Sequence, residues 1–451
     1  MMSVIEDVFS YVDENRDRYV ELVKRLVSQP SVSATGEGIN ECADLVAEAL
    51  EEHGVRAYTY TDHGGSPVVF GEVKAEAHAT IMFYNHYDVQ PPEPLDEWVS
   101  DPFNPKVAEG MIVGRGTADN KGNIAARIAA VDALFNTLGE VPVNVKFLIE
   151  GEEEVGSPSL ARFVELHQQL LFADGCVWEY GYRDKLGRPV LNLGVKGLLY
   201  VELEVREGRG DLHSSWGALV ENPAWRLVKA LSTLRDERGR VMIDGFYDDV
   251  EEPGQRVLEM LERIPAEVYD ASTLFGARVL EVENPARRLL LEPACNVCGL
   301  YSGYIGAGSK TVLPAKASAK LDFRLVPRQR PEDILAKLKK HLSNMGYGDV
   351  EVRMLQGYPA ARTDPEEPLV ELITSTAAEV YETEPVVLPS GYASGPMYII
   401  TNTLGIPCVS TGVGYYGSKP HAPNENIRIQ DLITGIKHIA LTMLRFHRAL
   451  H

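Results

Sequence analysis

Phe83-Tyr84-Asn85-His86-Tyr87-Asp88-Val89 is the stretch of this 451-residue chain from which its organisation can be worked out. It follows the apolar run 79–82, which is typical of a short buried strand. His86 and Asp88 are two residues apart, so their side chains point the same way on an extended strand. A neutral imidazole is a good ligand for a divalent transition metal, and a neighbouring carboxylate can orient the ring. Such a pair can also simply decorate a strand end, so only the acidic clusters that follow favour a metal site.

Asp119 belongs to the first of these clusters. It lies in Gly116-Thr117-Ala118-Asp119-Asn120-Lys121-Gly122, after the apolar strand predicted at 111–113 and before a helix expected from about Asn123. Aspartate is a common residue at helix N-termini, which is the simplest role for it. The alternative is a carboxylate held at the carboxyl end of a strand, where α/β sheets bind their ligands. The residues themselves leave both roles open.

A run of glutamates follows the strand predicted at 143–149. Runs of this kind are usually solvated loops, but carboxylates gathered around the end of a buried strand repel one another unless a cation is present. A further carboxylate, Glu179, ends the short apolar strand predicted at 175–178. These placements favour a metal site over a solvated loop. The glutamates of the run are Glu150, Glu152, Glu153 and Glu154.

Composition excludes several classes of partner. The chain has 44 Lys and Arg against 65 Asp and Glu, a formal net charge of −21, and no basic stripe, which argues against nucleic acid and anionic membranes. No apolar run is long enough to span a bilayer, and the start of the chain does not resemble a secretory leader, so a cytoplasmic protein is expected. Five irregularly spaced cysteines are not a disulfide framework, and we interpret the Cys295-Asn296-Val297-Cys298 motif as part of a strand.

The hydrophobic pattern predicts an α/β domain interrupted by a second domain. Helices expected at 5–27 and 39–52 precede three strands, the last of which ends at His86, and this order suggests a mostly parallel sheet flanked by helices. Residues 198–357 then follow a β-α-β-β-α-β order with amphipathic strands, typical of an α+β, ferredoxin-like domain. Its middle, about 239–293, is acidic and mostly helical in pattern. The domains predicted are thus 1–197 and 358–451 around an inserted 198–357.

The motifs and their order along the chain resemble those of the M20 family of dinuclear metallopeptidases. The resemblance covers nearly the whole chain. Each motif alone is weak, whereas their ordered combination is specific. Two further strings, Asp211-Leu212-His213-Ser214 and Gly308-Ser309-Lys310-Thr311-Val312-Leu313-Pro314, are most similar to the carnosine-dipeptidase-like branch. The motifs that carry the family resemblance are His86-x-Asp88, Gly116-Thr117-Ala118-Asp119-Asn120-Lys121-Gly122, Glu152-Glu153-Glu154-Val155-Gly156-Ser157, Glu179 and Lys419-Pro420-His421.

The resemblance implies a site for two divalent metal ions. Asp119 would bridge them, His86 and Glu179 would hold one, and Glu154 and His421 would hold the other. A nitrogen and oxygen ligand set of this kind suits Zn²⁺, with Mn²⁺ or Co²⁺ as alternatives. We therefore expect two divalent ions per chain, with zinc as the first candidate.

Three further residues acquire catalytic roles from the resemblance. Glu153 would be the general base. It would take a proton from a metal-bridging water, which leaves hydroxide, and pass that proton to the leaving amine. Asp88 would hold His86 in place. His213, in the inserted domain, resembles a histidine of the family's lid domain that reaches the neighbouring subunit's site in a dimer and helps to hold the oxyanion. This implies a homodimer formed through the lid domain, 198–357.

Substrate contacts are expected from the lid and from one loop. Arg324 resembles the family's arginine for the substrate's terminal carboxylate, which a guanidinium binds with two hydrogen bonds. The stretch 390–396, with Ser394 and Gly395, is expected to line the same pocket. The first hypothesis is therefore a hydrolase of dipeptides or short peptides with a free C-terminal carboxylate. The alternatives are an N-acyl amino acid amidohydrolase and a non-catalytic binding protein of the same fold.

Overall fold

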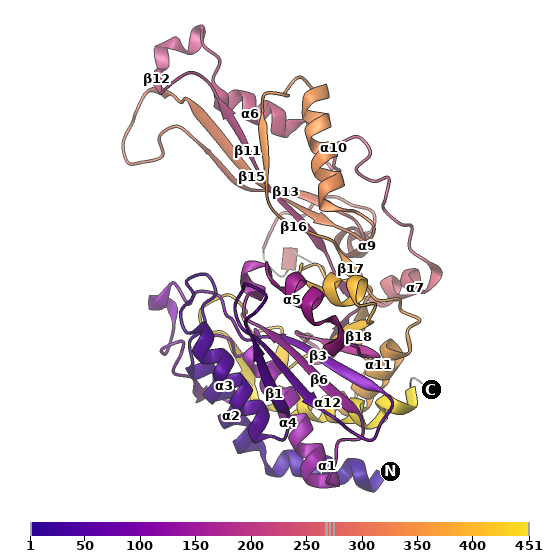
Figure 1. The fold of residues 1–451 in the computed structure, drawn as a ribbon. Coiled ribbons are helices and arrows are strands. Elements are labelled where there is room, and N and C mark those ends of the chain that lie inside the picture. The colour runs from indigo at the N-terminus through magenta and orange to yellow at the C-terminus, as the bar shows by residue number, and fades with distance from the viewer. Residues whose placement is uncertain (1, 267–268, 270–271, 274–275, 450–451) are drawn as a thin grey trace. The chain divides into compact units, whose positions relative to one another are not determined.

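The computed structural model describes residues 2–266, 269, 272–273 and 276–449, and the chain folds into two compact units (Figure 1). Unit 1 contains the described residues of 1–194, 362–389 and 395–451. Unit 2 contains those of 195–361 together with 390–394, so the segment 198–357 lies within it. The short strands β10 (Gly194–Val195) and β17 (Ala361–Arg362) lie where the chain passes from one unit to the other.

A large mixed sheet forms the centre of unit 1. Its middle strands β6, β3, β7 and β19 are mutually parallel, so their carboxyl ends meet at one edge. All residues of β3 are buried, as its apolar run predicts. In sheet order the strands are β1 (Arg56–Tyr60), β2 (Val68–Val73), β6 (Asn144–Glu150), β3 (Thr80–His86), β7 (Gly175–Trp178), β19 (Cys408–Ser410), β9 (Pro189–Asn192), β8 (Tyr182–Arg183) and β20 (Gly414–Tyr415), with β18 (Val386–Leu388) beside β9.

Helices flank this sheet (Figure 1). Residues 121–134 of α4 are all buried, because α4 packs on β3 and against both α2 and α12. The single helix predicted at 5–27 is two helices, which separate at Asn15, where the side-chain amide and the backbone N–H both donate to the Tyr11 carbonyl. The helices are α1 (Met2–Glu14), α2 (Arg16–Ser28), α3 (Ile39–Glu52), α4 (Lys121–Leu138), α5 (Leu160–His167), α11 (Pro368–Tyr381) and α12 (Ile429–Ala449).

A small antiparallel sheet in unit 1 joins two loops that are remote in sequence. Its strands are β4 (Lys106–Ala108), β5 (Met111–Val113) and β21 (Asn426–Arg428), and Val113 pairs with Asn426. The loop that leads from β5 to α4 carries Asp119, and the loop that precedes β21 carries His421. This sheet therefore brings the two loops side by side.

Unit 2 is built on an antiparallel sheet. Helices α6 (Pro223–Ser232) and α10 (Pro331–Asn344) pack on this sheet and share its apolar core. The strand order and the β-α-β-β-α-β sequence are those of a ferredoxin-like fold, as predicted. In sheet order the strands are β13 (Ala294–Ser302), β15 (Lys316–Leu325), β11 (Gly197–Arg206) and β16 (Glu351–Tyr358). A separate two-stranded ribbon is formed by β12 (Leu212–His213) and β14 (Val312–Leu313).

The segment predicted to be mostly helical, 239–293, holds the short helices α7 (Gln255–Arg263) and α9 (Pro285–Leu291) among its described residues. Residues 267–268, 270–271 and 274–275 of that segment lie outside the described part. Both cysteines of the Cys295–Cys298 motif are in strand β13, and all five cysteines of the chain are free thiols. Among the described helices none is long and apolar enough to cross a membrane.

Candidate metal centre

The candidate metal ligands gather at the carboxyl edge of the parallel strands. His86 is the last residue of β3, and Glu179 directly follows β7. Glu154 lies in a short 3₁₀ helix, residues 153–155, that follows β6. Asp119 precedes the N-terminus of α4, and His421 comes from the loop between β20 and β21. Each side chain is therefore delivered to the edge at which parallel sheets bind their ligands.

Asp119 lies between two histidines. Its Oδ1 is 3.1 Å from Nε2 of His86, and its Oδ2 is 3.1 Å from Nε2 of His421. Each histidine has a glutamate of its own: Glu179 Oε2 is 3.7 Å from His86 Nε2, and Glu154 Oε2 is 3.2 Å from His421 Nε2. The five side chains thus form two sets of three that share one carboxylate.

The residues present fit divalent metal ions. Within the described part of the chain, Glu154 Oε1 and Glu179 Oε2 are buried and have no hydrogen-bond partner. Buried polar atoms nearly always have partners, so these oxygens need a further group. Ligand atoms of His86, Asp119 and Glu154 lie within 4.8 Å of one another. Two imidazoles with carboxylates form a donor set that Zn²⁺, Mn²⁺ and Co²⁺ accept.

The electrostatics of the site point the same way. Burial raises the pKa of Glu179 to about 8. Burial and then the nearby Glu179 raise the pKa of Glu153 well above its ordinary value. The hydrogen bond to Asp119, followed by that to Glu154, raises the pKa of His421 to about 10. A divalent cation would favour the ionised carboxylates and the neutral imidazoles, because metal binding displaces protons from its ligands.

Asp88 has a second role besides the predicted orientation of His86. Its Oδ1 is 3.3 Å from Nδ1 of His86, and its backbone carbonyl is closer, at 3.0 Å. The same carboxylate accepts the backbone N–H groups of Glu153 at 3.2 Å and Glu154 at 3.0 Å. Asp88 therefore links the end of β3 to the short helix that carries both glutamates.

The acidic run divides into two kinds of glutamate. Glu150 accepts hydrogen bonds from the hydroxyls of Tyr84 at 2.6 Å and Ser157 at 2.7 Å. Glu152 accepts the backbone N–H of Ser66 at 2.8 Å. Local donors therefore satisfy Glu150 and Glu152, whereas Glu154 has a buried oxygen, Oε1, without a hydrogen-bond partner among the described residues and so favours a cation.

The residues expected to contact substrate lie in both units. In unit 2, Arg324 Nη1 donates to Ser394 Oγ at 2.7 Å, and its Nε donates to Asp322 Oδ2 at 2.9 Å. The structure thus brings together two residues that are 70 positions apart in sequence. Gly395 is in unit 1, where a Cβ added to it would lie 3.6 Å from Oε1 of Glu153. Gly395 therefore borders the Glu153 carboxylate.

His213 is exposed at the end of the β12 strand of unit 2. Its Nδ1 contacts Ser215, at 2.9 Å from the hydroxyl and 3.2 Å from the backbone N–H. The neighbouring Asp211 accepts the backbone N–H of Ala315 and so closes the base of the β12–β14 ribbon. The imidazole is thus oriented by its own segment.

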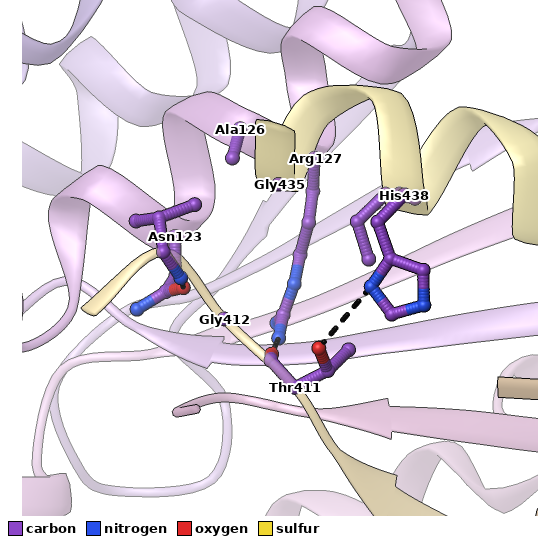
Figure 2. A pocket seen from close by; sticks show the side chains of 9 residues that line it. Asn123, Ala126, Arg127, Thr411, Gly412, Gly435 and His438 are labelled. Carbon is purple, nitrogen blue, oxygen red and sulfur yellow. Dashed lines mark hydrogen bonds between the residues drawn. The ribbon is translucent and has the colours of Figure 1, made fainter. Parts of the chain in front are cut away.

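Arg127 is a buried cation near the site whose role the sequence did not predict. The Arg127 guanidinium donates to the carbonyls of Tyr84, Trp178 and Thr411, and thereby joins the ends of β3, β7 and β19. Figure 2 shows its side chain reaching from α4 to Thr411, beside a small cavity that His438 also lines. Burial lowers the pKa of His438 to about 4, so its ring is neutral near pH 7. An arginine within an apolar helix is the only signal for this role in the sequence.

A family model and several known proteins match the chain. The model described as peptidase family M20/M25/M40 matches residues 82–445. The Cys-Gly metallodipeptidase dug1 of Schizosaccharomyces pombe is 30% identical over 76% of this chain and 77% of its own length. The solved M20 family metallo-carboxypeptidase Sso-CP2 of Sulfolobus solfataricus has a TM-score of 0.90 at 41% identity, covering 95% of this chain and 99% of that one.

Human carnosine dipeptidase 1 extends the match to nearly the full length. Its solved structure has a TM-score of 0.82 at 26% identity and covers 98% of this chain and 100% of its own. The family model's range, residues 82–445, contains all five proposed metal ligands: His86, Asp119, Glu154, Glu179 and His421. The chain therefore belongs to peptidase family M20/M25/M40 and is a metallopeptidase of that family.

Proposed function

We propose that the protein hydrolyses the amide bond of dipeptides or short peptides with a free C-terminal carboxylate, with the help of two divalent metal ions. The observation that carries this proposal is the Asp119 carboxylate, shared by two histidines that each have a glutamate partner. His86 and Glu179 would hold one ion, and Glu154 and His421 the other, with Asp119 between them. Zinc is the proposed metal, with manganese or cobalt as substitutes.

The chemistry follows from what surrounds this carboxylate. Divalent ions, when bound, would act as Lewis acids and lower the pKa of a water molecule at the site. Glu153 would accept a proton from that water and pass it to the departing amine nitrogen. Besides burial, the nearby Glu179 raises the pKa of Glu153, which supports a position beside the proposed ligands, where a general base is needed. Asp88 would hold the Glu153 backbone and the His86 ring in place.

Names of the similar proteins support peptide substrates. One is a Cys-Gly metallodipeptidase, and human and rodent relatives are Beta-Ala-His dipeptidases. These names favour peptide hydrolysis over the alternatives of N-acyl amino acid hydrolysis and non-catalytic binding. The Arg324–Ser394 pair supports recognition of a terminal carboxylate, because a half-exposed guanidinium with a hydroxyl beside it can donate several charge-assisted hydrogen bonds.

Metal removal is the experiment that tests this function. The purified protein should contain about two divalent ions per chain, as such dinuclear sites do. Exhaustive chelation should abolish hydrolysis of a dipeptide panel, and addition of Zn²⁺, Mn²⁺ or Co²⁺ should restore it. Elemental analysis would follow the metal content at each step. Full activity in protein that elemental analysis finds free of metal would exclude the proposed function.

Arg324→Met should raise KM far more than it lowers kcat. Loss of charge-assisted hydrogen bonds of about 1.5–3 kcal/mol corresponds to a rise in KM on the order of 10–100-fold. The rise should vanish for a substrate whose C-terminal carboxylate is amidated, because that substrate offers no anion to the arginine. The control is Arg353→Met, which removes an exposed arginine of the same sheet that pairs with Glu202. A KM increase of equal size for free and amidated substrates would contradict the role of Arg324.

We also propose a homodimer formed through unit 2, in which His213 of each chain serves the partner's site. Exposed apolar side chains near His213 support an interface there: Trp216 is 52% exposed and Leu219 is 82% exposed. Apolar side chains that lie close together on a surface are typical of interaction sites, and these two belong to the short segment 214–219. The location proposed is the cytoplasm, which the five free thiols support because thiols persist in reducing compartments.

A further inference from the structure

We infer that Glu425 is a positioning residue that holds the Asp119 loop and the His421 loop together, and thereby sets the metal affinity of both halves of the site. The inference rests on the proposed function, since it concerns the same metal centre. Glu425 is not one of the proposed ligands. It acts on them through the two loops that carry them.

The Glu425 carboxylate is buried and fully occupied by donors. Oε1 accepts the backbone N–H groups of Ala118 at 2.8 Å and Asp119 at 2.9 Å. Oε2 accepts the backbone N–H of Gly116 at 3.0 Å and Nη1 of Arg115 at 2.7 Å. One side chain therefore accepts four hydrogen bonds from residues 115–119 of a single loop, which carries the Asp119 carboxylate that both histidines contact.

The backbone of Glu425 belongs to the other loop. It lies four residues after His421 and directly before β21, and its carbonyl accepts the N–H of Gly114 at 2.9 Å. Glu425 therefore adds side-chain and backbone hydrogen bonds between the two loops to the pairing of β21 with β5. Side chains that hydrogen-bond to metal-ligand residues, and not to the metal, orient those ligands. Their loss typically lowers metal affinity by about 10–100-fold.

A carboxylate is the chemical group that this position requires. A glutamine has the same shape, but its amide NH₂ can only donate. In either orientation, that NH₂ would replace a carboxylate oxygen that accepts two hydrogen bonds. It would then face two donors, either the N–H groups of Ala118 and Asp119 or those of Gly116 and Arg115. Arg115 would also lose its buried counter-charge, because Glu425 is its ion-pair partner at 2.7 Å. The loop should therefore shift even though the volume of the side chain is unchanged.

Asp132 provides a matched control for Glu425→Gln. It too is a buried carboxylate of unit 1 with an arginine partner, Arg18, at 3.0 Å, and it also accepts the hydroxyl of Tyr19 at 2.9 Å. It lies in the middle of α4 and contacts neither metal loop. Asp132→Asn therefore reports what the loss of a buried charge does to stability alone.

The experiment measures metal affinity directly. Wild type, Glu425→Gln and Asp132→Asn would be titrated with Zn²⁺ against a chromogenic chelator, and the visible spectrum of each Co²⁺-loaded protein would be recorded. Glu425→Gln should bind both ions about 10–100-fold more weakly and show an altered Co²⁺ spectrum. Asp132→Asn should have a lower melting temperature with wild-type affinity and spectrum. If Glu425→Gln does not fold, Glu425→Asp, which keeps the charge but shortens the arm, is expected to show the same loss.

Wild-type affinity and spectrum in folded Glu425→Gln would overturn the inference and leave the proposed function intact. An equal loss of affinity in Asp132→Asn would also overturn it, since the effect would then be one of general stability. A wild-type protein that binds no metal in the same titration would remove the proposed function itself. The three results are distinguishable because each concerns a different protein in the same assay.

Discussion

Glu153→Gln is expected to lower kcat by about 10²–10⁴, the range for a positioned general base, while the metal content stays near that of wild type. The substitution keeps the shape of the side chain and removes its ability to take a proton. The backbone N–H of Glu153, which Asp88 accepts at 3.2 Å, is unaffected, so the short helix should keep its place. Steady-state kinetics together with elemental analysis of the same preparation would check both halves of the expectation.

The neighbouring residue supplies the contrast. Glu154→Gln should lose metal, because Glu154 Oε2 lies 3.2 Å from Nε2 of His421 and its other oxygen is buried without a hydrogen-bond partner among the described residues. Glu152→Gln is the control within the same run, since Glu152 contacts Ser66 and Ser159 instead of the site. Loss of metal in Glu153→Gln with metal retained in Glu154→Gln would mean that the two adjacent roles are reversed.

His213→Ala is expected to be nearly inactive with its metals in place. A preorganised donor to a developing oxyanion typically contributes about 10²–10³ in kcat. The Nδ1 contacts with Ser215 orient the ring before any substrate arrives, which is what preorganisation requires. Kinetics with metal analysis would measure the loss, and the metal content should equal that of wild type because His213 belongs to unit 2 and all five proposed ligands belong to unit 1.

Mixing two inactive variants tests whether His213 acts across a dimer. A dimer of one His213→Ala chain and one Glu153→Gln chain would contain one complete site, with Glu153 from the first chain and His213 from the second, as two-fold symmetry requires. Activity should therefore return on mixing. The control mixes His213→Ala with the double variant Glu153→Gln and His213→Ala, which offers no complete site. If subunits demonstrably exchange and activity does not return, His213 acts within its own chain or has no catalytic role.

Local patterns in the sequence predict much of the fold. The apolar run before His86 predicts strand β3, and the alternation after residue 197 predicts a ferredoxin-like sheet, because burial on one or both faces dictates which side chains a strand can carry. The pattern also placed Glu179 at a strand end, whereas Asp119 lies just before α4, and the strand that precedes it, β5, belongs to the small antiparallel sheet. The pattern failed at Asn15, where the helix predicted at 5–27 is divided into α1 and α2.

Sequence alone determined the residue types and their order, and from these the family and the candidate ligands. Only the tertiary structure decided which carboxylates face the site. Glu150 and Glu152 turn to local hydroxyl and N–H donors, whereas Glu154 meets a histidine 267 residues further along the chain. The supporting roles of Arg127 and Glu425 were likewise invisible in the sequence. Their partners are mostly backbone groups from distant segments, and a backbone N–H or carbonyl is the same for every residue type, so only folding reveals where it lies.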